Sequence, residues 1–441
     1  MIKNSPHILE IKMKENTACI MNFGCQMNEY ESLTITKMLD KAGYELISSA
    51  DQAELVIFNT CTVRDNADEK IWNRLSSLVP QKRKNKAKKI GIMGCMVEAQ
   101  REVFLKKHPE IDFLISPVEL PQISKVLRDL TARSYEEYST YELMLDEKAK
   151  FPFRTYMPIQ TGCNFNCSYC IVPAVKGREV NLSPDEIFKK LDSLVEKGVK
   201  EITLLGQTIN SYKHEDIKFA DLLEMTALRY KGVWIRFLTS HPILFDEKII
   251  DIVAKHENLC SYFHIPAQSG NSRILKEMKR GYTREKYLKL ISKMREVKDV
   301  CISTDMICGF PSETDEEFED SLSMMREIGY ETAFMFYYSE RKNTPATDMD
   351  DSIPVSIRKE RLAKMIDQQL SMQGDIYQKF VGKIYKVLVE NKARKGENCL
   401  KARTAGNLPV IFEGDISLIG SFVNVKIDSA TSHTLLATLQ D

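Results

Sequence analysis

Three cysteines within eight residues, Cys163, Cys167 and Cys170, carry the clearest chemistry in this 441-residue chain. Thiolates at this spacing can reach one soft-metal centre, and thiolate ligands select zinc or iron–sulfur clusters. A structural zinc ion normally needs a fourth protein ligand. A four-iron cluster held by three cysteines keeps one iron free for another molecule. The motif therefore predicts a catalytic iron–sulfur cluster, with a zinc knuckle or plain buried cysteines as the alternatives.

A second set of cysteines, Cys25, Cys61 and Cys95, lies at the ends of three apolar runs. The runs span residues 18–25, 54–61 and 89–95, and each is typical of a buried parallel strand. Functional groups gather at the carboxyl ends of such strands, so three thiols can reach one cluster although they lie far apart in sequence. Three buried structural cysteines are the alternative, because free cysteine is among the most buried residue types. We expect a second metal site here.

The elements that must position the second set follow a βαβ pattern. Amphipathic stretches at residues 28–42 and 66–78 separate the three apolar runs, which predicts an open parallel α/β domain over residues 15–133. Residues 134–150 are charged and rich in tyrosine, and we interpret them as a linker.

The first set lies near the start of a longer α/β block, residues 151–373. Six strands separated by charged helical patterns are predicted at residues 156–161, 201–205, 234–238, 261–265, 300–307 and 333–338, and a last helix at 357–371. Six βα units predict a partial TIM-like (βα)6 barrel. After residue 374 the pattern changes to short β-like runs at 383–390, 408–414 and 422–428, which predict a small antiparallel β-barrel over 374–441.

Composition narrows the class of protein. Lysine plus arginine and aspartate plus glutamate both number 62, so the net charge is zero and any RNA binding must come from local basic patches. The N-terminal residues lack the apolar core of a signal peptide, and no apolar run is long enough to span a bilayer. We therefore expect a cytoplasmic protein with reduced cysteines.

Two basic clusters stand out in the sequence. Residues 82–89 are expected to be a solvated loop. A second set is expected to contact RNA and comprises Lys383, Lys386, Lys392, Arg394, Lys395, Lys401 and Arg403.

The motif CNFNCSYC, with an aromatic residue before its last cysteine, resembles the loop of the radical S-adenosylmethionine (SAM) superfamily. The segments FGCQMNEYES, NTCTVRDNADEK and GIMGCMVEAQ extend the likeness to the methylthiotransferase family within it. That resemblance implies two 4Fe-4S clusters and SAM as cofactors. It also implies the order of an N-terminal cluster domain, a radical SAM barrel and a C-terminal TRAM domain.

Further segments, GREV, LLGQTINSY, RFLTSHP, HIPAQSGNSRILKEMKRGYTRE and DMICGFPSET, resemble the branch that acts on tRNA. The implied activity adds a methylthio group to carbon 2 of the dimethylallyl (isopentenyl) adenosine 3′ of the anticodon. A methylthiotransferase for threonylcarbamoyladenosine or for a ribosomal protein aspartate is the alternative, and a non-catalytic iron–sulfur RNA-binding protein is a second. The chain departs from the branch near the expected substrate mouth, at Ala174, Val175, Lys176, Asn181 and Leu182.

The resemblance also implies the site residues and partners. Cys163, Cys167 and Cys170 would hold the cluster that binds SAM and makes the 5′-deoxyadenosyl radical, and Cys25, Cys61 and Cys95 would hold the cluster associated with the transferred sulfur. The expected SAM contacts are Tyr169, Gln207, Gln268, Arg280 and Asp305. The expected partners are the tRNA anticodon stem-loop and an electron donor such as flavodoxin or ferredoxin, and the enzyme is expected to be a monomer.

Overall fold

The computed structural model describes residues 13–61, 65–137, 153–396 and 398–440. They form two compact units. The first comprises Met1–Asp146 with Ala174–Gly177, and the second comprises Glu147–Pro173 with Arg178–Asp441. Most of the predicted linker, residues 138–150, lies outside the described residues. The division into domains at residues 134, 151 and 374 stays a prediction. Among the described residues, no helix combines the length and the apolar character that crossing a bilayer requires.

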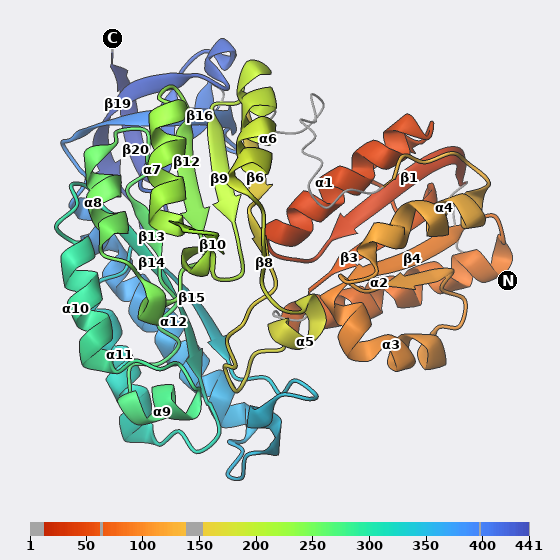
Figure 1. The fold of residues 1–441 in the computed structure, drawn as a ribbon, viewed down its shortest axis with the longest axis horizontal. Coiled ribbons are helices and arrows are strands. Elements are labelled where there is room, and N and C mark those ends of the chain that lie inside the picture. Colours follow the sequence, from red (N-terminus) through yellow and green to blue (C-terminus); the bar gives the residue numbers. More distant parts are fainter. Residues whose placement is uncertain (1–12, 62–64, 138–152, 397, 441) are drawn as a thin grey trace, which may run out of the picture. The chain divides into compact units, whose positions relative to one another are not determined.

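The first unit contains a five-stranded parallel sheet in the order β2-β1-β3-β4-β5 (Figure 1). The three strands expected from the sequence are present as β1, β3 and β4, and the short strands β2 and β5 extend the sheet at both edges. The bounds are Lys14–Asn22 for β1, Glu45–Leu46 for β2, Ala53–Thr60 for β3, Lys89–Gly94 for β4 and Phe113–Ile115 for β5.

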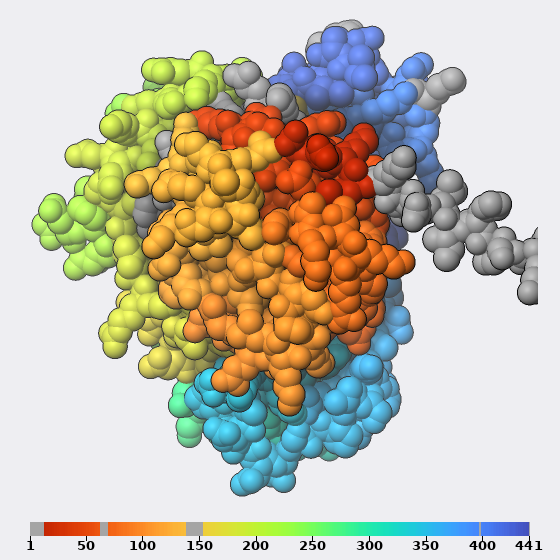
Figure 2. Space-filling view, turned by 90° about the vertical axis from the view of Figure 1, so that its right-hand side faces the viewer, coloured from red at the N-terminus to blue at the C-terminus, as the bar shows by residue number. Residues whose placement is uncertain are grey.

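Helices cover both faces of this sheet because both faces of its central strand are apolar. Along β3, Leu55 and Ile57 join one core, whereas Val56 and Phe58 join the other. The first core includes side chains of α1 and α4, and the second includes side chains of α2 and α3; these helices supply much of the red and orange surface in Figure 2. The bounds are Gln26–Lys41 for α1, Asp65–Lys84 for α2, Cys95–Lys107 for α3 and Ile123–Thr131 for α4.

The second unit begins with the predicted partial barrel, which is confirmed. Two parallel three-stranded sheets, β12-β9-β6 and β13-β14-β15, meet through an isolated parallel bridge between Ile235 and Leu259. The strands are β6 (Arg154–Pro158), β9 (Glu201–Leu205), β12 (Trp234–Leu238), β13 (Tyr262–His264), β14 (Cys301–Cys308) and β15 (Thr332–Tyr337). The predicted strand at 156–161 is divided into β6 and the short β7 (Gln160–Thr161), which pairs with β8 (Val180–Asn181).

Helices lie on the outer side of the barrel strands (Figure 1). They are α6 (Pro184–Glu196), α7 (Phe219–Arg229), α8 (Lys248–Lys255), α9 (Ser272–Glu277), α10 (Arg284–Met294), α11 (Asp315–Ile328) and α12 (Val355–Gln378). The short helix α5 (Val172–Lys176) follows the cysteine loop.

The C-terminal strands close into a five-stranded barrel in the order β16-β17-β18-β20-β19. Their bounds are Ile384–Lys392, Cys399–Thr404, Pro409–Glu413, Phe422–Ala430 and Leu435–Gln440 for β16 to β20. The expectation of an antiparallel barrel needs one correction, since β18 and β20 run parallel where they close it. The sequence pattern also missed β17, where polar residues alternate with a buried face, and β20, where only Leu435 is buried.

A buried ion network joins this small barrel to the amino-terminal ends of the larger barrel's strands. Glu201, the first residue of β9, lies 2.9 Å from Arg236 and also pairs with Arg154 and Arg403. Glu390 of β16 forms ion pairs with two of the same arginines, Arg154 and Arg403. The charges compensate one another, which a buried carboxylate requires.

Candidate functional site

Cys25, Cys61 and Cys95 all lie at the carboxyl edge of the first unit's sheet. Cys25 follows β1 by three residues and is the N-cap of α1, Cys61 directly follows β3, and Cys95 is the first residue of α3. Strands β1, β3 and β4 are neighbours in the sheet. The topology therefore brings together three thiols that are far apart in sequence.

A buried amide network holds this edge in place. Asn28 accepts hydrogen bonds from the Cys25 thiol at 3.2 Å and from its backbone N–H at 3.2 Å. The Asn28 amide donates to Asn59 at 2.7 Å and to the Thr60 carbonyl, and Asn59 donates back to the Asn28 carbonyl at 2.7 Å. Gly94 has φ of +100° and presses against the Thr60 carbonyl, where a Cβ would lie 2.3 Å away.

The three thiols experience different electrostatics. A hydrogen bond with the Cys61 thiol lowers the pKa of Cys25 to about 6, against the opposing effect of burial. Burial raises the pKa of Cys95 to about 12. The lowered value favours the thiolate that binds iron, because only deprotonated cysteine is a metal ligand.

Cys163, Cys167 and Cys170 lie in the loop after β7, at the carboxyl end of the larger barrel. The Phe165 N–H donates to the Cys163 sulfur at 3.4 Å, and the Thr208 hydroxyl lies 3.5 Å from that sulfur. Burial, together with the neighbouring Cys167 and Cys163, raises the pKa of Cys170 to about 12. The thiols of Cys163, Cys167 and Cys170 are thus close enough to affect one another electrostatically.

Arg280 and Tyr169 make contacts that hold this loop in place. The buried Arg280 guanidinium donates to the Cys167 sulfur at 3.3 Å and to the Pro266 carbonyl at 3.1 Å. Tyr169 packs against a small core that includes Phe310 and Tyr338. Of these two predicted SAM contacts, Tyr169 therefore lies within the cysteine loop and Arg280 lies beside it.

The other predicted SAM contacts lie at or near the same ends of the barrel strands. The side-chain oxygens of Gln207 and Gln268 are buried without a hydrogen-bond partner. Gln268 has φ of +70°, and its backbone bonds to both Asp305 and Ile307 of β14. Unpartnered buried oxygens are costly, so these two point to a missing polar ligand. The Asp305 carboxylate lies 3.4 Å from the His264 Nε2.

Sequence reasoning missed one residue of this edge, His241. Its ring stacks on Phe165 with 4.1 Å between centroids, and its Nε2 is buried without a partner. Burial, assisted by the charge of Arg280, lowers the pKa of His241 to about 2, so the ring is neutral. The motif RFLTSHP contained the signal, because a histidine three residues after a barrel strand lies at the carboxyl end.

Both cysteine sets have the ligand chemistry of iron–sulfur clusters, because both consist of cysteine alone, the usual ligand of 4Fe-4S clusters. Throughout the described ranges, no group of three His, Cys, Asp or Glu side chains is placed to hold a single metal ion.

The expected basic patches need correction. Residues 82–89 are the expected solvated loop only in part: Arg83, Lys84 and Lys86 are exposed around the turn between α2 and β4, whereas Lys82 pairs with Asp112 and the buried Lys88 donates to the Ala50 and Ala53 carbonyls. In the C-terminal barrel, Arg403 belongs to the buried ion network, which removes it from the RNA-facing set.

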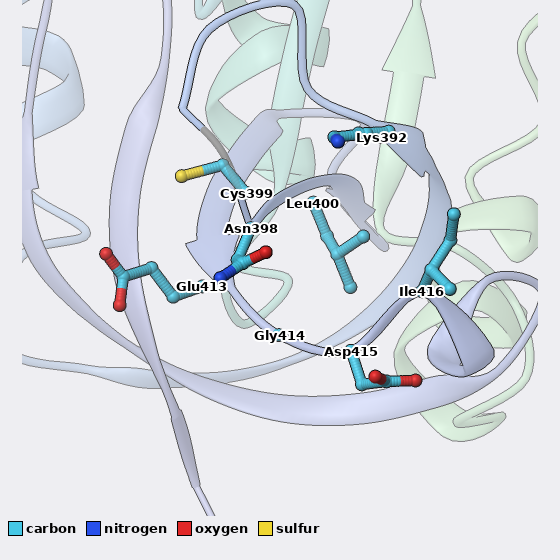
Figure 3. A pocket seen from close by; sticks show the side chains of 8 residues that line it. All are labelled: Lys392, Asn398, Cys399, Leu400, Glu413, Gly414, Asp415 and Ile416. Atoms are coloured by element: carbon cyan, nitrogen blue, oxygen red, sulfur yellow. The ribbon is translucent and has the colours of Figure 1, made fainter.

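Two other basic residues of the C-terminal set also pair with acidic residues of this chain. Lys383 pairs with Asp299 at 3.3 Å, and Lys401 lies 3.8 Å from Glu390. The exposed cations Lys392, Arg394 and Lys395 remain at or just after the end of β16, and the exposed Lys386 lies over the Phe422 ring. Beside them is an open pocket of about 570 Å³ whose lining includes Lys392, Asn398 and Ile416 (Figure 3).

Three family models match successive parts of the chain. The model of the radical SAM superfamily matches residues 157–325, that of the uncharacterized protein family UPF0004 matches residues 17–116, and that of the TRAM domain matches residues 378–439. A tRNA-2-methylthio-N(6)-dimethylallyladenosine synthase of Clostridium perfringens (strain SM101) is 39% identical, covering 98% of this chain and 99% of the relative. The enzyme of that name from Parabacteroides distasonis is 38% identical over 96% and 95% of the two chains.

A solved structure supports the fold. The radical S-adenosylmethionine methyltransferase TsrM from Kitasatospora setae, with cobalamin and a [4Fe-4S] cluster bound, has a TM-score of 0.56 with this chain at 13% identity. The similarity covers 75% of this chain and 77% of that one.

Proposed function

We propose, from the premise that this chain belongs to the family of the tRNA-2-methylthio-N(6)-dimethylallyladenosine synthases, that it is a tRNA methylthiotransferase. It adds a methylthio group to carbon 2 of the dimethylallyl (isopentenyl) adenosine 3′ of the anticodon. The observation that carries the proposal is the presence of two separate three-cysteine sets, each at the carboxyl ends of parallel strands. The C–H bond at carbon 2 is not acidic, so a general base could not activate it, and a radical route is required.

The two cysteine sets have different roles. Cys163, Cys167 and Cys170 would hold the cluster that supplies SAM cleavage, and Cys25, Cys61 and Cys95 would hold the cluster associated with sulfur transfer. When bound, SAM and the clusters supply one-electron and sulfur chemistry that protein side chains lack. The chain's own residues fix the thiols. At the first set Asn28 accepts a hydrogen bond from the Cys25 thiol, and at the second Arg280 donates one to the Cys167 sulfur.

The SAM contacts are Tyr169, Gln207, Gln268, Arg280 and Asp305. Their position beside the second cysteine set supports this assignment, as do the two unpartnered glutamine oxygens. An amide oxygen accepts hydrogen bonds, and the amino group and ribose hydroxyls of SAM can donate them. Arg280 holds Cys167 at the same time, which couples SAM binding to the geometry of the cluster loop.

The small C-terminal barrel supplies affinity for the tRNA anticodon stem-loop. Phosphate contacts position a nucleic acid without reading its sequence, and the exposed Lys392, Arg394 and Lys395 have the charge for that task. An electron donor such as flavodoxin or ferredoxin completes the reaction. The monomeric state and the cytoplasmic location stay predictions.

The test is mass spectrometry of an anticodon stem-loop bearing dimethylallyladenosine after incubation with anaerobically reconstituted enzyme, SAM and a reductant. We expect a methylthio product from the wild type and none from Cys163→Ala. Cys399→Ala is the matched control, because this partly exposed thiol lies in neither cysteine set, and it should retain activity. A reconstituted wild type that cleaves SAM without modifying this RNA would contradict the assigned substrate.

A further inference from the structure

Strand β15 is unusually open for a barrel strand. Its sequence is TAFMFY, yet none of its six side chains is buried, and Phe334 is 44% exposed. In the neighbouring β14, by contrast, six of eight residues are buried. An aromatic surface left open inside an enzyme's barrel is a candidate binding surface.

Phe334 lies on the inner face of the barrel. Side chains alternate along a strand, so Ser303, Asp305 and Ile307 share one face of β14. Asp305 is in register with Phe334, and the Phe334 ring meets His264 edge-on with 5.9 Å between centroids. The opposite face of β14 meets α12, where the Cys308 sulfur lies 3.7 Å from a carbonyl of that helix.

The same inner face reaches the cysteine loop. Ile307 packs in the small core that contains Tyr169, the residue before Cys170. A molecule stacked on Phe334 would therefore lie near the cysteine loop. Asp305, which is in register with Phe334, and Ile307 are successive residues on the same face of β14.

Hydrogen bonds orient the polar groups beside the Phe334 ring. The His264 Nδ1 lies 2.8 Å from the Ser303 hydroxyl, and its Nε2 lies 3.4 Å from the Asp305 carboxylate. The Tyr262 hydroxyl holds Ser303 from the other side at 2.6 Å. The Asp305 side chain is 28% exposed, so its carboxylate stands next to an open aromatic face.

We propose that Phe334, flanked by the His264–Asp305 pair, is the subsite that stacks the target adenine of the substrate RNA. This inference rests on the proposed function. Single RNA bases are recognised by an aromatic ring against the base face and polar groups at its edge. SAM also carries an adenine, expected beside Tyr169 and Ile307, so Asp305, itself an expected SAM contact, would border both molecules.

The experiment compares Phe334→Ala with Phe334→Tyr, which keeps the ring, and with Leu228→Ala, an exposed apolar residue of α7. Affinity is measured with the reconstituted full chain for two stem-loops, one with the target adenosine and one abasic at that position. Losing a stacked base contact weakens binding by about fivefold to 150-fold. We expect this loss for Phe334→Ala on the adenosine stem-loop only, with both other variants near wild type.

A second readout separates the two adenines. SAM cleavage in the absence of RNA should stay within about twofold of wild type in Phe334→Ala. A parallel loss of this cleavage would assign the subsite to SAM and overturn the proposal, as would equal weakening on the abasic stem-loop. Were the wild type to give no methylthio product, the proposed function would fail, and the two stem-loop affinities would still decide what Phe334 contacts.

Discussion

Lys176 and Glu31 form a buried ion pair of 2.6 Å beside the first cysteine set. Glu31 lies on α1, the helix that begins after Cys25, and its second oxygen has no hydrogen-bond partner. Burial alone would lower the pKa of Lys176, but Glu31, Cys95 and Cys25 together raise it. The lysine is therefore a fixed positive charge facing the predicted cluster ligands.

Lys176→Met should shift the reduction potential of the cluster at Cys25, Cys61 and Cys95 to a more negative value, because a nearby positive charge stabilises the reduced cluster. Redox titration followed by electron paramagnetic resonance measures it in protein that lacks the other cysteine set. Lys176→Arg should restore the potential, and Lys364→Met, which removes an exposed cation of α12, should not move it. An unchanged potential in Lys176→Met would show that the lysine does not act on the cluster.

Glu201→Gln should destabilise the second unit by about 3–5 kcal/mol, the usual cost of breaking a buried ion pair. Three arginines would lose the charge that compensates them. Denaturant unfolding measures the loss, with Glu360→Gln as the control, since its exposed i,i+4 pair contributes less than about 1 kcal/mol. A loss no larger than that of the control would contradict the role of the network.

The same carboxylate gives a pH dependence with a definite sign. Burial raises its pKa, but the attraction of Arg236, Arg403 and Arg154 outweighs burial and lowers the pKa to about 2. A lowered folded-state pKa stabilises the fold above the unfolded value of about 4.3. That contribution is lost as the pH falls toward 2. The free energy of unfolding of wild type should therefore decrease over this window more steeply than that of Glu201→Gln.

Replacing Lys392, Arg394 and Lys395 together with alanine should weaken tRNA binding and flatten its salt dependence. Each lost phosphate contact reduces the slope of log K against log salt by about 0.7 to 0.9. The control replaces Lys276, Lys286 and Lys289, three exposed lysines of α9 and α10, and carries the same change in charge. Equal slopes for the two triple variants would move the RNA contacts elsewhere.

The sequence predicted the main strands well because apolar runs and cysteines mark them directly. Both barrels and the parallel sheet are present, and each cysteine of the first set lies within three residues of a strand's end. Partners distant in sequence were not predictable. Arg403 belongs to a dense basic run, yet its side chain is mostly withdrawn from solvent because Glu201 and Glu390 lie opposite it in the fold. The solvent exposure of β15 was likewise not predictable, since TAFMFY has the composition of a buried strand.

Iron content distinguishes the two cysteine sets. Replacing Cys163, Cys167 and Cys170 together with alanine should leave about four irons per chain after anaerobic reconstitution, held by the other set. Iron and sulfide analysis measures this, with wild type expected at about eight. A triple variant that binds no iron, or as much as wild type, would contradict two independent clusters.

The division of labour between the sets is the central claim, and one measurement tests it most directly. The variant with Cys25, Cys61 and Cys95 replaced by alanine is incubated with SAM, reductant and the stem-loop, and both products are quantified by mass spectrometry. We predict 5′-deoxyadenosine without methylthio-modified RNA, because the barrel cysteines alone hold the iron that binds SAM. Methylthio-modified RNA from this variant, or loss of all SAM cleavage in a variant that remains folded, would contradict the account.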